Sequence, residues 1–201
     1  MPAPPEALQP PPRDGEQSPA AAAEPEIAED EETIETDSAP QVPIVGVVAS
    51  AGGLEAFTLL ASQFPAEPGF AVVIVQHLSP GFESALPELL SSQVRMPVRR
   101  IIDGMTVEPN NIYFAPSDTQ AVVEKGVFRL LPRPTDIRQH SPGDAFLRSL
   151  ADYAGERAIG VVLSGNAADG ANGLRDIKAV GGLALVQDPQ TAKFDGMPRS
   201  A

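Results

Sequence analysis

From residue 43 onward, short runs of consecutive apolar residues alternate with segments in which apolar residues recur every three or four positions. The short runs predict strands buried on both faces, and the longer segments predict amphipathic helices. The predicted strands are Pro43–Ala49, Phe70–Val75, Val98–Ile102, Ala158–Leu163 and Leu183–Gln187. The predicted helices are Gly52–Ser62, Glu83–Gln93, Asp144–Tyr153 and Asn172–Val180.

Residues 103–134 follow a different pattern. Gly, Pro, Asn and Asp separate three short β-like runs, and this spacing predicts antiparallel hairpins. The runs are Ile112–Ala115, Ala121–Glu124 and Val127–Leu131. Strands alternate with helices on both sides of this region. We therefore predict an α/β fold with a doubly wound, mostly parallel sheet, helices on both of its faces and a β-hairpin insertion.

The first 42 residues have a composition of their own. They hold eleven acidic residues, a single base (Arg13), nine prolines and no aromatic side chain. Such a segment buries too little apolar surface to offset the entropy of an ordered chain. We expect residues 1–42 to be a disordered acidic leader, either passively solubilising or an arm for a basic partner, and residues 43–201 to be the folded domain.

Composition also excludes several classes of protein. The absence of cysteine rules out disulfides, a thiolate nucleophile and cysteine-ligated metals, and we expect no metal and no cofactor. No apolar run is long enough to span a membrane, and no secretory signal is visible. A pI near 4.4 argues against nucleic-acid binding. These features indicate a cytoplasmic protein without membrane insertion.

Polar residues follow three of the predicted strands. Ser50 begins the sharp turn Ser50-Ala51-Gly52-Gly53, whose glycines allow a ligand to approach the backbone closely. His77 directly follows the second strand, and Asp169 ends a glycine-bracketed loop after the strand 158–163. Each also has an ordinary structural interpretation: a helix N-cap for Ser50 and Asp169, and a packed or surface histidine for His77.

Open parallel sheets place their sites beyond the carboxyl ends of the strands, where all three residues are expected. A hydroxyl, a base and a carboxylate are the groups that nucleophilic acyl transfer requires. The order Ser, His, Asp differs from that of α/β-hydrolases, and the Gly-x-Ser-x-Gly elbow is absent. A nucleotide-binding module is disfavoured because the glycine fingerprint is missing, and the acidic spacing of a calcium loop is missing too.

Five blocks of the sequence, in this order, resemble the catalytic domain of the chemotaxis-receptor protein-glutamate methylesterases. The blocks are Val45–Ala56, Val75–Phe82, Asp103–Met105 with Tyr113–Pro116, Ile159–Gly170 and Phe194–Ser200. The resemblance covers residues 43 to 201. It implies that Ser50 is the nucleophile, His77 the general base and Asp169 the residue that orients the histidine.

The resemblance also implies a substrate and a mechanism. Family members remove the γ-methyl ester from glutamates on the cytoplasmic helices of chemoreceptors, and they also deamidate receptor glutamines. Backbone N–H groups would bind the oxyanion. By position, the N–H of Asn166 is the candidate, together with one from Ala51 or Gly52. His140 resembles a residue of a loop that closes over the family's site, and contact with substrate and a plain loop role remain equal alternatives.

Two departures from the family pattern keep an alternative open. Residues 1–42 do not form the receiver domain of the prototype, and the family continues for about one helix and one strand beyond Ala201. The Phe194–Ser200 block is especially similar to relatives in which a receptor methyltransferase domain follows, so a fused or separate methyltransferase is a candidate partner. The alternative function is a non-catalytic, methylesterase-like docking domain of a longer signalling protein.

Overall fold

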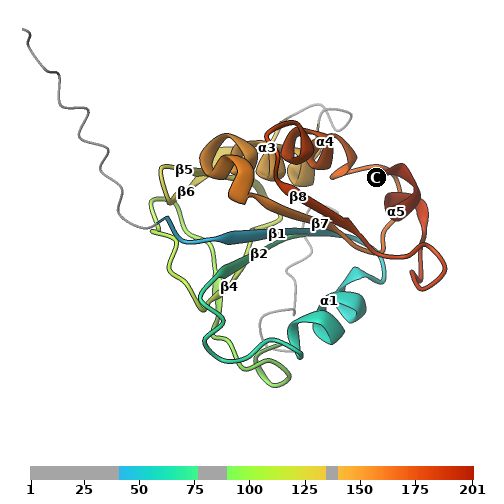
Figure 1. Ribbon diagram of the computed structural model, residues 1–201, viewed down its shortest axis with the longest axis horizontal. Coiled ribbons are helices and arrows are strands. Elements are labelled where there is room, and N and C mark those ends of the chain that lie inside the picture. The colour runs from blue at the N-terminus through green and yellow to red at the C-terminus, as the bar shows by residue number, and fades with distance from the viewer. Residues whose placement is uncertain (1–40, 77–89, 135–139) are drawn as a thin grey trace, which may run out of the picture. The chain divides into compact units, whose positions relative to one another are not determined.

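The computed structural model describes residues 41–76, 90–134 and 140–201 of the chain. Within them, six strands form one parallel sheet in the order β3-β4-β2-β1-β7-β8 (Figure 1). The strands are β1 Ile44–Ala49, β2 Ala71–Gln76, β3 Val98–Arg100, β4 Ile112–Phe114, β7 Ile159–Val162 and β8 Leu183–Val186. The chain runs outward from β1 in one direction and returns to add β7 and β8 on its other side, as a doubly wound sheet requires.

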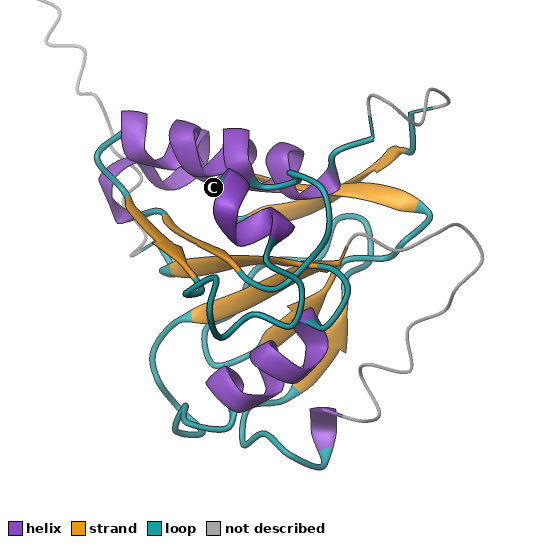
Figure 2. Cartoon of the chain, turned by 90° about the vertical axis from the view of Figure 1, so that its right-hand side faces the viewer, coloured by secondary structure: helices purple, strands orange, loops and turns teal. Residues whose placement is uncertain are grey.

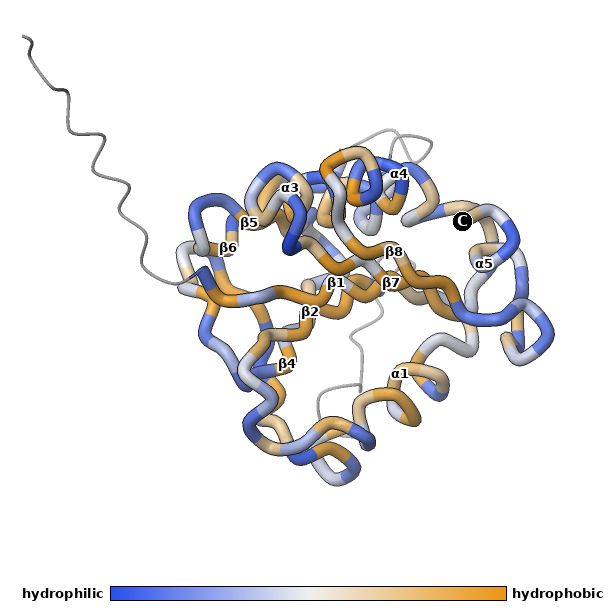
Figure 3. Tube along the Cα trace, in the orientation of Figure 1, coloured by the Kyte–Doolittle hydropathy of each residue, from blue (hydrophilic) through white to orange (hydrophobic). Residues whose placement is uncertain are grey.

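Helices cover both faces of this sheet, as predicted (Figures 1 and 2). The helix α1 (Gly53–Ala61) lies on one face, and α3 (Pro142–Ala154) and α4 (Ala171–Ala179) lie on the other. The sequence pattern explains the layers, because the central strands are apolar on both faces, while α3 and α4 carry polar residues as well as apolar ones (Figure 3).

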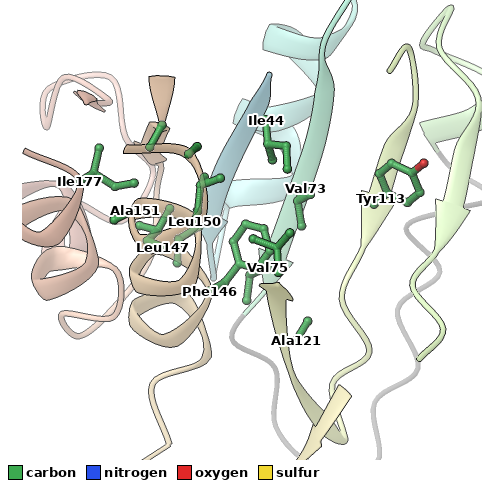
Figure 4. Packing of buried hydrophobic residues seen from close by; sticks show 14 of the residues in the cluster. Ile44, Val73, Val75, Tyr113, Ala121, Phe146, Leu147, Leu150, Ala151 and Ile177 are labelled. Carbon is green, nitrogen blue, oxygen red and sulfur yellow. The ribbon is translucent and has the colours of Figure 1, made fainter. Parts of the chain in front are cut away.

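The larger of two apolar clusters lies between the sheet and α3. Phe146, Leu147 and Leu150 of α3 are fully buried and face Ile44 and Val73 of the sheet (Figure 4). Glycine permits the contact to be this close. A Cβ added at Gly46 of β1 would lie 2.8 Å from a terminal carbon of Leu147, so only glycine fits the present packing there.

The prediction for residues 103–134 was wrong in one respect. Ile112–Phe114 is not part of a hairpin but a strand of the main sheet, paired in parallel with β2 and β3. All three of its residues are buried, which suits an interior strand with neighbours on both sides. The hairpin consists of β5 (Thr119–Glu124) and β6 (Val127–Pro132), which form a two-stranded sheet of their own, and an isolated bridge joins Val127 to Thr106.

The other predicted elements agree with the structure to within a few residues. Most of the predicted helix Glu83–Gln93 lies outside the described residues, as does the leader up to residue 40. Two short helices were not predicted, namely the 3₁₀ turn Gly155–Arg157 and α5 (Gly196–Ser200). Among the described residues, no helix is long and apolar enough to cross a membrane.

Candidate functional site

Ser50 lies where the central strand β1 ends, at the turn into α1. Its N–H donates to the carbonyl of Ser164, and its own carbonyl accepts from the N–H of Gly53 at 2.9 Å. Gly52 has a φ of 70°, a left-handed conformation that favours glycine. The two glycines were expected to admit a ligand. In the structure, Ser164 and Lys193 pack closely against these glycines. A Cβ added at Gly52 or Gly53 would lie within 3.0 Å of an atom of Ser164 or Lys193.

Asp169 is almost fully buried and is held at the N-terminus of α3. Its two carboxylate oxygens accept the N–H groups of Gly143 and Asp144 at 3.1 and 3.0 Å. The free N–H groups and positive end of a helix stabilise a charged carboxylate. The interpretation of Asp169 as the N-cap of the following helix is wrong, because Gly170 occupies that position without a side-chain cap.

A second buried carboxylate repeats this arrangement in the opposite direction. Asp144 of α3 accepts the N–H of Gly173 at 2.9 Å and the side-chain amide of Asn172 at 3.2 Å, near the start of α4. Each of the two helix N-termini is therefore bound by a carboxylate from the other segment. Asp169 is therefore bound to the N-terminus of α3 and does not cap α4, the helix that follows it in the sequence.

The loop after β7 runs beside the serine turn. A Cβ added at Gly165 would lie 2.8 Å from the Cβ of Ser50, so the loop passes directly alongside the serine side chain. Asn166 is exposed, and Ala167 has a φ of 71°, which is uncommon for a residue other than glycine. In the part of the chain that the structure describes, the backbone N–H groups of Ala51, Gly52 and Asn166 donate to no acceptor.

Of the two histidines, the structure describes only His140. His77 lies outside the described residues, so its predicted role is untested. The last pair of the β1–β2 ladder is Ala49 with Gln76, and Ser50 and His77 are the next residues in the sequence. His140 is buried in the segment that leads into α3, three residues before Gly143, which binds Asp169. His140 and Asp169 thus belong to adjoining segments.

Two hollows flank α1 next to the serine turn. One has a volume of about 430 Å³ and the other about 440 Å³, and both are lined by Gly52, Glu55, Leu59 and Lys193. Ser50 lines neither of the two hollows. No group of three or more His, Asp or Glu residues suited to a metal ion occurs in the described segments.

Sequence reasoning missed two residues that the structure brings to this turn. Ser164 follows the strand β7 and contacts Ala51 through its hydroxyl, while Lys193 packs against Gly52. The position of Ser164 directly after a buried strand was a usable signal, because it is the same position that drew attention to Ser50 and His77. The sequence carried no comparable signal for Lys193.

The fold and this edge of the sheet define a doubly wound α/β protein with polar groups gathered at the carboxyl ends of its central strands. Comparison with known proteins gives the family. The chain belongs to the CheB methylesterase family, whose family model matches residues 45–201. Its fold also matches the crystal structure of the Thermotoga maritima CheB methylesterase catalytic domain, with a TM-score of 0.72 and 29% identity over 79% of this chain and 86% of that one.

Curated relatives carry the corresponding name. A protein-glutamate methylesterase/protein-glutamine glutaminase of Chromohalobacter salexigens is 37% identical over 82% of this chain and 47% of its own length. The protein of the same name from Pyrococcus horikoshii is 32% identical over 81% of this chain and 46% of its own length. The chain thus spans about half the length of these relatives.

Proposed function

We propose that this chain is a serine hydrolase that removes the methyl ester from glutamate residues of chemoreceptors and also deamidates receptor glutamines. The observation that carries the proposal is that Ser50 directly follows β1, while the buried Asp169 carboxylate is held at the N-terminus of α3, where Gly143 packs against Val48 of the same strand. Membership of the CheB methylesterase family and the names of the curated relatives support the same reaction.

The proposed catalytic residues are Ser50, His77 and Asp169. The β1–β2 register supports the choice of His77, because Ser50 and His77 follow the paired residues Ala49 and Gln76. The packing at Gly143 supports the choice of Asp169, because it places the carboxylate near β1. A Cβ added at Gly143 would lie within 3.0 Å of both the Val48 side chain of β1 and the Asp169 carboxylate. The carboxylate would orient the imidazole and stabilise its charged form.

The reaction has two steps. In the first step, the Ser50 oxygen bonds to the ester carbonyl carbon while His77 takes the proton of the Ser50 hydroxyl. The bond from that carbon to the methoxy oxygen breaks, and His77 gives the proton to the leaving methanol. In the second, His77 takes a proton from water, the hydroxide oxygen bonds to the acyl carbon, and Ser50 leaves with the proton. The product is the receptor glutamate.

Backbone N–H groups are proposed to stabilise the oxyanion in both steps. The donors are those of Asn166, Ala51 and Gly52, which have no other acceptor within the described segments. One such donor typically contributes about 3–4 kcal/mol to transition-state binding. A backbone donor at position 166 does not depend on the asparagine side chain. His140 is kept as a candidate for substrate contact.

The proposed partners are the methylated cytoplasmic helices of chemoreceptors, with a methyltransferase domain, fused or separate, as the enzyme that supplies the ester. The proposed location is the cytoplasm, where these helices lie. The protein would work without a cofactor, since the serine, the imidazole and the carboxylate supply every group that ester hydrolysis needs.

Methanol release from a methylated chemoreceptor fragment tests the proposal. We expect release by the wild-type chain and a loss of at least about a thousandfold for Ser50→Ala, because the covalent step is removed. The matched control is Ser62→Ala, which removes a half-buried serine at the other end of α1. Equal release by the wild-type and Ser50→Ala chains would leave the docking-domain alternative.

A further inference from the structure

Ser164 connects the segments that surround the proposed site. Its side chain is fully buried. Its Oγ donates to the carbonyl of Ala51 at 2.9 Å and accepts the N–H of Phe194 at 3.0 Å. Through its backbone, Ser164 also accepts the N–H of Ser50 at 3.1 Å and donates to the side chain of Gln187 at 2.8 Å.

The direction of the Ser164 hydroxyl proton follows from these contacts. One lone pair of Oγ is occupied by the N–H of Phe194, so the proton points toward a carbonyl. Two carbonyls are within reach, that of Ala51 at 2.9 Å and that of Phe194 at 3.3 Å, and the shorter contact is to Ala51. The hydroxyl therefore holds the Ala51 carbonyl on the interior side of the turn.

This contact determines where the next N–H points. The described peptide bonds are all trans, and in a planar trans peptide the carbonyl and the N–H point in opposite directions. With the Ala51 carbonyl fixed toward Ser164, the N–H of Gly52 is directed away from it. The Ser50–Ala51 peptide is fixed in the same manner, because the Ser50 carbonyl accepts the N–H of Gly53. The N–H of Ala51 therefore points away from Gly53. Both N–H groups of the turn are thereby left available for an anionic oxygen.

We propose that Ser164 is a positioning residue for the reaction proposed above: its hydroxyl sets the orientation of the Ala51–Gly52 peptide, and thus presents the Gly52 N–H to the oxyanion. The inference rests on the proposed function. A preorganised donor is effective because it needs no reorientation while charge develops. A buried side chain that touches no substrate acts here through the backbone of the nucleophile turn.

The test compares Ser164→Ala, which deletes the hydroxyl, with Ser164→Thr, which retains it. Methanol release from a methylated chemoreceptor fragment gives kcat and KM. For Ser164→Ala we expect kcat to fall about 10- to 100-fold with little change in KM, because the lost interaction acts mainly in the transition state. We expect Ser164→Thr to recover most of that loss. Ser164→Cys, of similar volume but a weaker donor, should fall between them and replaces Ser164→Ala if that variant does not fold.

Gln187→Ala is the matched control. It removes a hydrogen bond to the backbone N–H of Ser164 and leaves the hydroxyl contact with Ala51 in place. We expect it to lower the unfolding temperature while kcat stays within about threefold. A kcat for the hydroxyl-deleted variant within threefold of wild type would overturn the inference. So would equal losses of kcat in that variant and in Gln187→Ala, since the effect would then be one of stability.

A second probe separates this inference from the proposed function. A fluorophosphonate bonds to the Ser50 oxygen with loss of fluoride and places a phosphonyl oxygen where the oxyanion would lie. A wild-type chain that neither releases methanol nor reacts with the probe would contradict the proposed function. A wild-type chain that does both, with an unchanged labelling rate in the Ser164→Ala chain, would contradict only the role of Ser164.

Discussion

At the scale of single residues, Asp169 and Asp144 allow the structural role of a buried carboxylate to be distinguished from a catalytic role. Asp169 and Asp144 each accept hydrogen bonds at the N-terminus of a helix, but only Asp169 has a proposed part in the reaction. Replacement of either by asparagine removes the charge and turns part of the side chain into a donor that faces N–H groups. The structural penalty is therefore similar at the two positions.

We accordingly expect Asp169→Asn and Asp144→Asn each to lower the free energy of unfolding, by about 1–3 kcal/mol. Only Asp169→Asn should also lower kcat severely, by about 10⁴, because the imidazole would adopt the wrong tautomer. Urea denaturation and methanol release, measured on both variants, check this. A similar loss of kcat in the two variants would show that Asp169 matters for folding alone.

The sequence singled out Ser50 because it directly follows a buried strand, and Asp169 because it closes the loop after another, and parallel strands bring such positions to one edge. Their catalytic roles stay predictions. The pattern gave no sign that Asp169 is held by α3 rather than α4, since that contact joins residues 25 and 26 positions apart in the sequence. Ser164 was passed over although it also follows a buried strand, and only the structure shows that its hydroxyl bonds to the Ala51 carbonyl.

At the scale of elements, α5 shows where sequence patterns fail. Five residues are too few for a helical period, so its formation depends on tertiary contacts. The N–H of Met197 donates to the carbonyl of Gly165, and a Cβ at Gly165 would lie 2.1 Å from the Met197 sulfur. The strand 112–114 was misassigned for a related reason, because three residues do not reveal whether their partners are parallel or antiparallel.

The ion pair of α5 makes a prediction about pH. Arg199 donates to the Asp195 carboxylate at 2.6 Å, and this hydrogen bond together with the positive charge lowers the pKa of Asp195 from its usual 3.8. A carboxyl group whose pKa is lower in the folded state stabilises the fold fully above its unfolded pKa. That contribution is lost as the pH falls through the lowered value.

We therefore expect Arg199→Gln to lower the unfolding temperature slightly at about pH 6, and the difference from wild type to shrink as the pH approaches about 3. Thermal unfolding followed by circular dichroism at several pH values measures this. In an Asp195→Asn background the same substitution should have an effect that does not change with pH. A difference that grows on acidification would contradict the assigned direction.

At the scale of the whole sheet, the two edges differ in how they meet solvent. The edge strand β3 presents the exposed charges of Arg99 and Arg100, which discourage pairing with another sheet. The other edge of the described sheet, β8, presents apolar side chains instead. Leu183, Leu185 and Val186 are 52%, 46% and 40% exposed, respectively. An edge strand with free backbone groups and apolar side chains is a template for association.

We expect the 201-residue chain to self-associate through β8 as its concentration rises, and Leu185→Lys to shift that association to concentrations at least about tenfold higher, since a charge at the edge must be desolvated on pairing. Sedimentation velocity over a concentration series measures the shift. Leu59→Lys is the control, because it removes an exposed leucine of α1 rather than one of the edge strand β8. If Leu59→Lys weakens association and Leu185→Lys does not, the contact lies along α1, where the two hollows beside Gly52 would then form the shared surface.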